Sequence, residues 1–141
     1  MQKVALLMIT LCMLGSCKKE LRSKTYMLRE LNHSGISGTV TFNETSNSAI
    51  TSVVLEAKGL RTDTLYHTHL HLGRPGALTG TLIYFRELRT TTGTVHREEN
   101  WSETFDNALQ SNTCFTMHNP DFFTNDSSGY VLAGNTGANA Q

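Results

Sequence analysis

From residue 35 onward, apolar and β-branched residues alternate with polar ones in short runs, and turn-forming residues separate these runs. Alternation with a period of two is typical of strands that bury one face. It predicts strands over residues 36–42, 50–60, 65–72, 81–88, 101–105, 113–117 and 129–133, with a polar connection over 90–100 and a short helical or looped connection over 107–112. Several short strands at regular spacing predict an all-β fold, a Greek-key β-sandwich of about seven to eight strands.

The first residues follow a different pattern. Lys3 precedes an apolar run over residues 4–14, which is shorter than the roughly 20 residues that cross a bilayer and has the length of a signal-peptide core. The run ends in Leu14-Gly15-Ser16-Cys17, which resembles the lipobox of bacterial lipoproteins. This resemblance implies that residues 1–16 are a cleaved signal peptide and that the Cys17 thiol carries the lipid.

A lipid-modified Cys17 makes the membrane a partner of the chain and places it in the cell envelope. Residues 17–34 are then the lipid anchor and tether, and residues 35–141 form the β-sandwich domain. Within the tether, residues 26–31 fit either a first strand or a short helical turn. Lys18 does not resemble an inner-membrane retention signal, so we expect the outer membrane.

Composition narrows the function classes. The chain has 12 Lys and Arg against 12 Asp and Glu, and no basic patch indicates nucleic-acid binding. The sequence does not indicate a protein partner. Of the three cysteines, Cys12 lies in the signal segment and Cys17 takes the lipid. Cys114 therefore has no intramolecular partner, and we expect a small buried side chain there.

The segment with the clearest chemistry is His67-Thr68-His69-Leu70-His71. Alternate residues of a strand share a face, so the three imidazoles are predicted on one side and Leu70 on the other. Two histidines at i and i+2 can reach one metal ion, whereas a third at i+4 needs a bend or bulge.

Three further histidines, His33, His96 and His118, stand elsewhere, and His118 ends a predicted strand. Nitrogen donors of this kind suit copper or zinc better than magnesium or calcium. The alternative interpretation is that the histidines form hydrogen bonds on a wet sheet face and bind no metal.

One resemblance covers most of residues 36–134. His69-Leu-His71-Leu-Gly73-Arg-Pro-Gly76 is similar to the His-x-His-x-Gly-x-x-Gly segment of CHRD domains, the type also found in chordin. Phe115-Thr-Met-His118-Asn-Pro and the Gly-bounded stretch from Gly129 to Gly134 are similar to the closing strands of that family. The usual Gly-Glu-Ile-Arg-Gly is absent from the final strand.

A weaker resemblance joins the chain to copper/zinc superoxide dismutases. It rests on residues 37–42, on 58–60, and on Tyr66-His67-Thr68-His69, which is similar to the aromatic-His-x-His strand that supplies two copper ligands there. By this likeness His67, His69 and His118 are candidate copper ligands. The zinc-loop residues, the subloop disulfide and the guiding arginine of that family have no counterparts here, so the likeness supports the sandwich fold, of superoxide dismutase-like or immunoglobulin-like type, better than the activity.

Together these features predict an envelope-anchored lipoprotein with a CHRD-like domain, a binding module without catalysis that takes a transition metal through His69, His118 and either His67 or His71. Two alternatives stay open: a copper-dependent redox enzyme of the superoxide dismutase type, and an adhesion or interaction module without metal. For the core we expect five buried side chains, Val54, Leu70, Leu72, Ile83 and Val131.

Overall fold

The computed structural model describes residues 20–121 and 127–140, including the backbone but not the side chains of residues 86, 87 and 127. The signal segment 1–16 and Cys17 lie outside the described residues. The strands are β1 (Ser23–Glu30), β2 (Ser37–Glu44), β3 (Thr51–Lys58), β4 (Tyr66–Arg74), β5 (Ala77–Leu88), β6 (Thr94–Trp101), β7 (Asn112–His118) and β8 (Tyr130–Gly137). The helices are α1 (Phe105–Gln110) and two 3₁₀ turns, η1 (Ser127–Gly129) and η2 (Ala138–Ala140).

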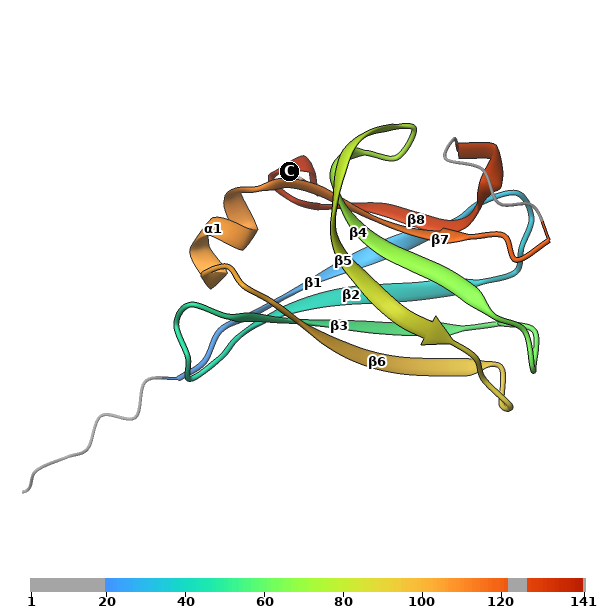
Figure 1. Cartoon of the computed structure of the whole chain (residues 1–141), viewed down its shortest axis with the longest axis horizontal. Helices are drawn as coiled ribbons and strands as arrows, with labels where there is room; N and C mark the ends of the chain where they lie inside the picture. Colours follow the sequence, from blue (N-terminus) through green and yellow to red (C-terminus); the bar gives the residue numbers. More distant parts are fainter. Residues whose placement is uncertain (1–19, 122–126, 141) are drawn as a thin grey trace, which may run out of the picture.

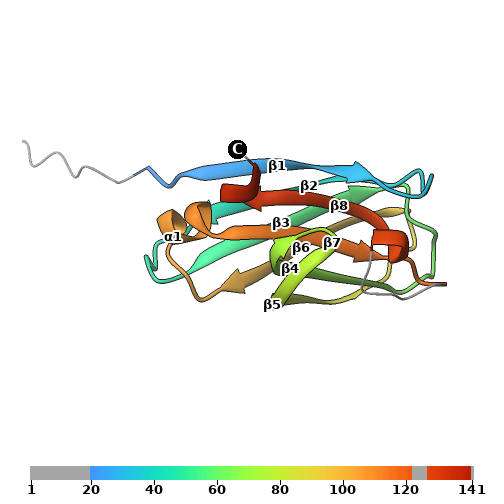
Figure 2. The ribbon, with the colours of Figure 1, turned by 90° about the horizontal axis from the view of Figure 1, so that it is seen from above.

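The eight strands form one antiparallel sheet in the order β5-β4-β7-β8-β1-β2-β3-β6. The sheet curls so that its two halves face each other, which confirms the predicted all-β, sandwich-like fold (Figures 1 and 2). β1 joins the halves, because Ser23 to Leu28 pair with β2 whereas Arg29 and Glu30 pair with β8.

The core lies between the two halves. Alternate residues of β2 and β3 point into it, including Val40, Phe42 and Leu55, and all three are fully buried. Leu70 and Phe115 are opposite each other on β4 and β7 and enter the core from the other half. Period-two alternation in each strand therefore gives one continuous apolar layer.

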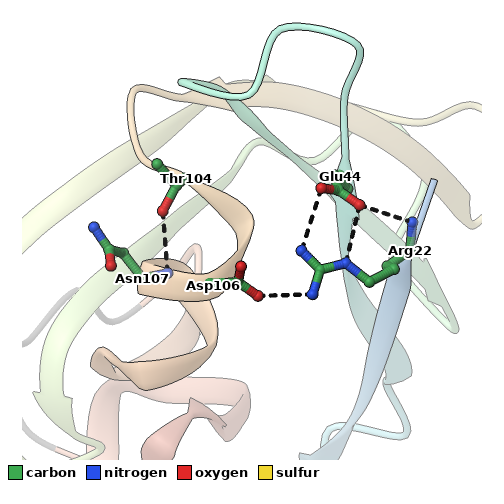
Figure 3. Close-up of polar contacts among 5 residues, drawn as sticks. All are labelled: Arg22, Glu44, Thr104, Asp106 and Asn107. Atoms are coloured by element: carbon green, nitrogen blue, oxygen red, sulfur yellow. Dashed lines mark hydrogen bonds and ion pairs between the residues drawn. The ribbon is translucent and has the colours of Figure 1, made fainter. Parts of the chain in front are cut away.

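Helix α1 closes one end of the sheet beside the start of β1 (Figure 3). The Thr104 hydroxyl accepts the amide N–H of Asn107 at 3.2 Å and caps the helix N-terminus. Arg22 reaches both carboxylate oxygens of the buried Glu44, at 3.0 and 3.2 Å, and donates to Asp106 of the helix at 2.8 Å. These charge-assisted contacts tie the first residues of the domain to β2 and α1.

Three sequence-based expectations about the elements need correction. The segment predicted as a polar connection, 90–100, contains most of β6, and residues 101–105 are not a strand of their own. β6 pairs with β3 along its whole length, so the pairing outweighs its many charged residues. The sheet also begins at Ser23, before the start of the domain that we placed at residue 35.

The predicted core is confirmed in part. Leu70, Ile83 and Val131 are buried, at 0%, 7% and 6% exposure. The prediction that Leu72 is buried is wrong, because this side chain is 38% exposed. It lies near the end of β4, and the register with β5 shifts between Leu72 and Gly73. Val54 is only half-buried, since its neighbours Val53 and Leu55 take the inward positions of β3.

Candidate metal centre

The two strands that carry the candidate ligands are neighbours. β4 pairs antiparallel with β7, and Leu70 lies opposite Phe115 while His69 lies opposite Thr116. Because opposite residues share a face, Leu70 and Phe115 point into the core, and His69 and Thr116 point to the outer face of this half. His118 is two residues beyond Thr116 and therefore projects from the same outer face.

The structure brings His69, His71 and His118 together. One ligand nitrogen of each lies within 4.8 Å of the other two. The ring centroids of His69 and His71 are 5.2 Å apart, and those of His69 and His118 are 5.1 Å apart. Two nitrogens on one ion, each at about 2.0–2.1 Å, are at most about 4.2 Å apart. Small side-chain rotations therefore suffice to bring all three nitrogens onto a single ion.

The orientation of His71 is set by the β4–β5 hairpin. Its Nδ1 lies 3.2 Å from the carbonyl oxygen of Gly80 and 3.1 Å from the hydroxyl of Thr81. A carbonyl can only accept, so the contact with Gly80 places the proton on Nδ1 and leaves the lone pair on Nε2. A backbone carbonyl that accepts the other ring N–H is a usual outer partner of a metal-binding histidine.

Two nitrogens of the cluster are buried without a hydrogen-bond partner among the described residues: Nδ1 of His69 and Nε2 of His71. A buried polar atom in this state costs about 1–3 kcal/mol, and native proteins contain few of them. A bound cation would satisfy both atoms at once. The donor set therefore fits a transition metal, as three imidazoles suit copper or zinc.

Electrostatics keep the imidazoles in the form that binds metal. Burial, and to a smaller extent the neighbouring His118, His71 and His67, lowers the pKa of His69 to about 4. Burial also lowers the pKa of His71, although its contact with the Gly80 carbonyl opposes the shift. Both side chains are therefore neutral at pH 7, and a metal need not displace a proton from them.

The other histidines lie outside this group. His67 is exposed at the start of β4, where the register with β5 shifts between Tyr66 and Thr68. His96 is exposed on β6, with Nδ1 at 3.1 Å from a carboxylate oxygen of Glu56. His33 is an exposed turn residue with a φ of 53°. Of the two histidines that the sequence left open, the structure thus places His71 with His69 and His118.

Cys114 lies opposite His71 across β4 and β7, and it is fully buried, as expected. Among the described residues its thiol is free. Burial raises the pKa of its thiol to about 12, so it is protonated at neutral pH and is a poor metal ligand and nucleophile.

Sequence reasoning missed the residues that surround the cluster. The Tyr84 ring lies 4.8 Å from that of His69, and this side chain is 67% exposed, so it stands at the outer edge of the site. Tyr130 is fully buried and packs its ring 5.0 Å from that of His118. Only the strand register places Tyr84, Tyr130 and Thr81 here, and alternation within one strand does not reveal register.

No model of a known protein family matches the chain. A search of curated proteins likewise found no match. None of the helices in the part of the chain that the structure describes is long and apolar enough to span a bilayer.

Proposed function

We propose that this chain is an envelope-anchored lipoprotein whose CHRD-like β-sandwich binds copper or zinc through His69, His71 and His118. The observation that carries the metal-binding part is the meeting of three imidazoles, two of which bury a nitrogen that has no hydrogen-bond partner among the described residues. The anchoring part rests on the sequence Leu14-Gly15-Ser16-Cys17 behind a short apolar run.

Three protein ligands leave a coordination position for water or a small ligand, in the manner of open zinc and copper sites. The chain's own residues would hold the ion, fix the His71 tautomer through Gly80 and Thr81, and present Tyr84 at the outer edge. We assign the domain a binding role, because the zinc-loop residues and the guiding arginine of superoxide dismutases have no counterparts in the sequence.

Calorimetric titration of copper and zinc into the untagged, metal-free protein tests the site. We expect His69→Ala, His71→Ala and His118→Ala each to weaken binding by at least about 100-fold, since each removes one of three ligands. His67→Ala is the matched control from the same strand and should retain affinity within about threefold. Equal affinity in all four variants would remove this cluster from metal binding.

The anchor and the absence of catalysis have separate tests. Labelling cells with a fatty-acid analogue should mark the wild type and leave Cys17→Ala unmarked. Label on the variant would contradict acylation at this residue. Robust superoxide turnover by the copper-loaded protein would show that the domain is a redox enzyme and contradict a purely binding role.

A further inference from the structure

A groove of about 710 Å³ lies along β1 and β8, and Arg74 and Pro75 at the turn between β4 and β5 also line it. It exists because β1 changes partners. The first part of β1 pairs with β2, and within β1 only Arg29 and Glu30 pair with β8, while β8 pairs with β7 from Tyr130 to Gly137. After Glu30 the chain stays beside β8, because the Leu31 amide N–H donates to the carbonyl oxygen of Val131, so the part of β1 that is not paired with β8 lies before Arg29.

The groove carries charge of one sign. Lys24, Arg29 and Arg74 line it, and no Asp or Glu is among its lining residues. All three cations are exposed and form no ion pair with a described carboxylate, unlike Arg22 and Arg61. In a chain whose formal charge sums to zero, this is a local excess of three positive charges. Asn135 and Asn139 add amide groups to the same lining.

The short distance in sequence between the groove and Cys17 indicates which ligands lie near the groove. Lys24 follows Cys17 by seven residues, and a fully extended chain of that length spans at most about 25 Å. If Cys17 carries the lipid, as the proposed function requires, the groove lies within that distance of the membrane surface. Phosphates of anionic lipids are the anions that a membrane surface offers to basic residues.

We propose that this groove binds the headgroup phosphates of anionic lipids in the membrane that holds the anchor. Arg29 and Arg74 provide guanidinium groups that suit a phosphate, and Lys24 adds a third positive charge at the end nearest to the anchor. This contact turns a flexible lipid tether into a docked domain with a defined orientation.

The orientation has a consequence for the histidine cluster. Arg29 pairs with Ala133, Ala133 with Thr116, and Thr116 with His69, so these residues form one row across four strands. Opposite residues share a face, and strands are about 4.8 Å apart, which places the backbones of Arg29 and His69 about 14 Å apart on the same outer face. A domain docked through Arg29 therefore holds its metal centre beside the lipid surface.

The test uses residues 17–141 with Cys17→Ser, so that no lipid is attached. This chain contains all of the strands that the structure describes, the first of which begins at Ser23. Its binding is measured by sedimentation with vesicles of phosphatidylcholine, alone or mixed with phosphatidylglycerol. We expect binding to the mixed vesicles only, weakened about 25-fold by Arg29→Gln with Arg74→Gln, at roughly fivefold per cation.

The matched control is Lys58→Gln with Arg89→Gln, which removes the same charge from exposed positions outside the groove. If both double variants weaken vesicle binding equally, net charge alone explains the effect and the proposal is overturned. Absence of binding to mixed vesicles would overturn it as well, and calorimetric binding of glycerol phosphate in that case would assign the groove to a soluble anion. Failure here leaves acylation of Cys17 and metal titration unaffected, so the proposed function is judged separately.

Discussion

His69 and His118 come from two adjacent strands, β4 and β7, and their ring centroids lie 5.1 Å apart on the outer face of the sheet. Both are nearly excluded from solvent, at 9% and 1% exposure. Buried imidazoles in edge-to-face contact are uncommon on the outer face of a sheet, because histidine side chains are more often partly exposed. The ligand nitrogens of His69 and His118, with that of His71, all lie within 4.8 Å of one another, as the proposed metal site requires.

The outer partner of His71 should control metal affinity. Thr81→Val removes the hydroxyl 3.1 Å from His71 Nδ1 but retains the shape of the side chain. We expect affinity for copper or zinc to fall about tenfold, at the lower end of the range for such partners, because the Gly80 carbonyl still orients the ring. Thr79→Val, an exposed position on the same strand, should change affinity less than twofold in the same titration.

The stability of the metal-free protein should depend on pH through His69. Its folded pKa of about 4 is below the value of about 6.5 in the unfolded chain, so only the unfolded state takes up this proton between those pH values. The free energy of unfolding should therefore fall as the pH drops from 6.5 toward 4, by at most about 3 kcal/mol, and this contribution should be constant above pH 7.

Urea unfolding with chelator at pH 7.5 and pH 5 measures this difference. His69→Gln should lose less stability between the two pH values than the wild type, since glutamine takes up no proton. His96→Gln changes an exposed histidine and should behave as the wild type does. A wild-type pH dependence that survives in His69→Gln would show that other groups cause it.

Leu70 and Leu72 test the register of β4. They are two residues apart on the same side of a strand, yet Leu70 is fully buried and Leu72 is 38% exposed. We expect Leu70→Ala to lower the free energy of unfolding by about 2–5 kcal/mol and Leu72→Ala by less than about 1.5 kcal/mol, as measured by urea midpoints. Equal losses would mean that β4 continues into the core as simple alternation predicts.

Gly134 should be intolerant of a side chain where β8 passes β1. A Cβ at this position would lie 2.9 Å from Leu28 Cδ2 and 3.1 Å from the carbonyl oxygen of Met27. The backbone of β1 cannot easily move, so Gly134→Ala should destabilise the fold by about 1–3 kcal/mol. Gly80→Ala meets only Leu72, at 3.9 Å, and its thermal midpoint should stay near that of the wild type.

Features that depend on the order of residues within one strand could be predicted from the amino-acid sequence. Alternation in residues 36–42 and 66–71 was enough to predict an all-β fold, the burial of Leu70 and the common face of His69 and His71. The chain also showed that His118 ends a strand. These features follow from the two-residue period of an extended backbone, which is a property of each segment alone.

The choice of neighbouring segments could not be predicted from the sequence and is seen in the folded domain. Pairing with β3 makes β6 a strand despite its charges, and pairing with both β2 and β8 brings β1 into the sheet. The register between β4, β5 and β7 selects His71 over His67 and exposes Leu72. Strand order and register are set by contacts between residues far apart in the sequence, and a pattern within one strand carries no information about its partner.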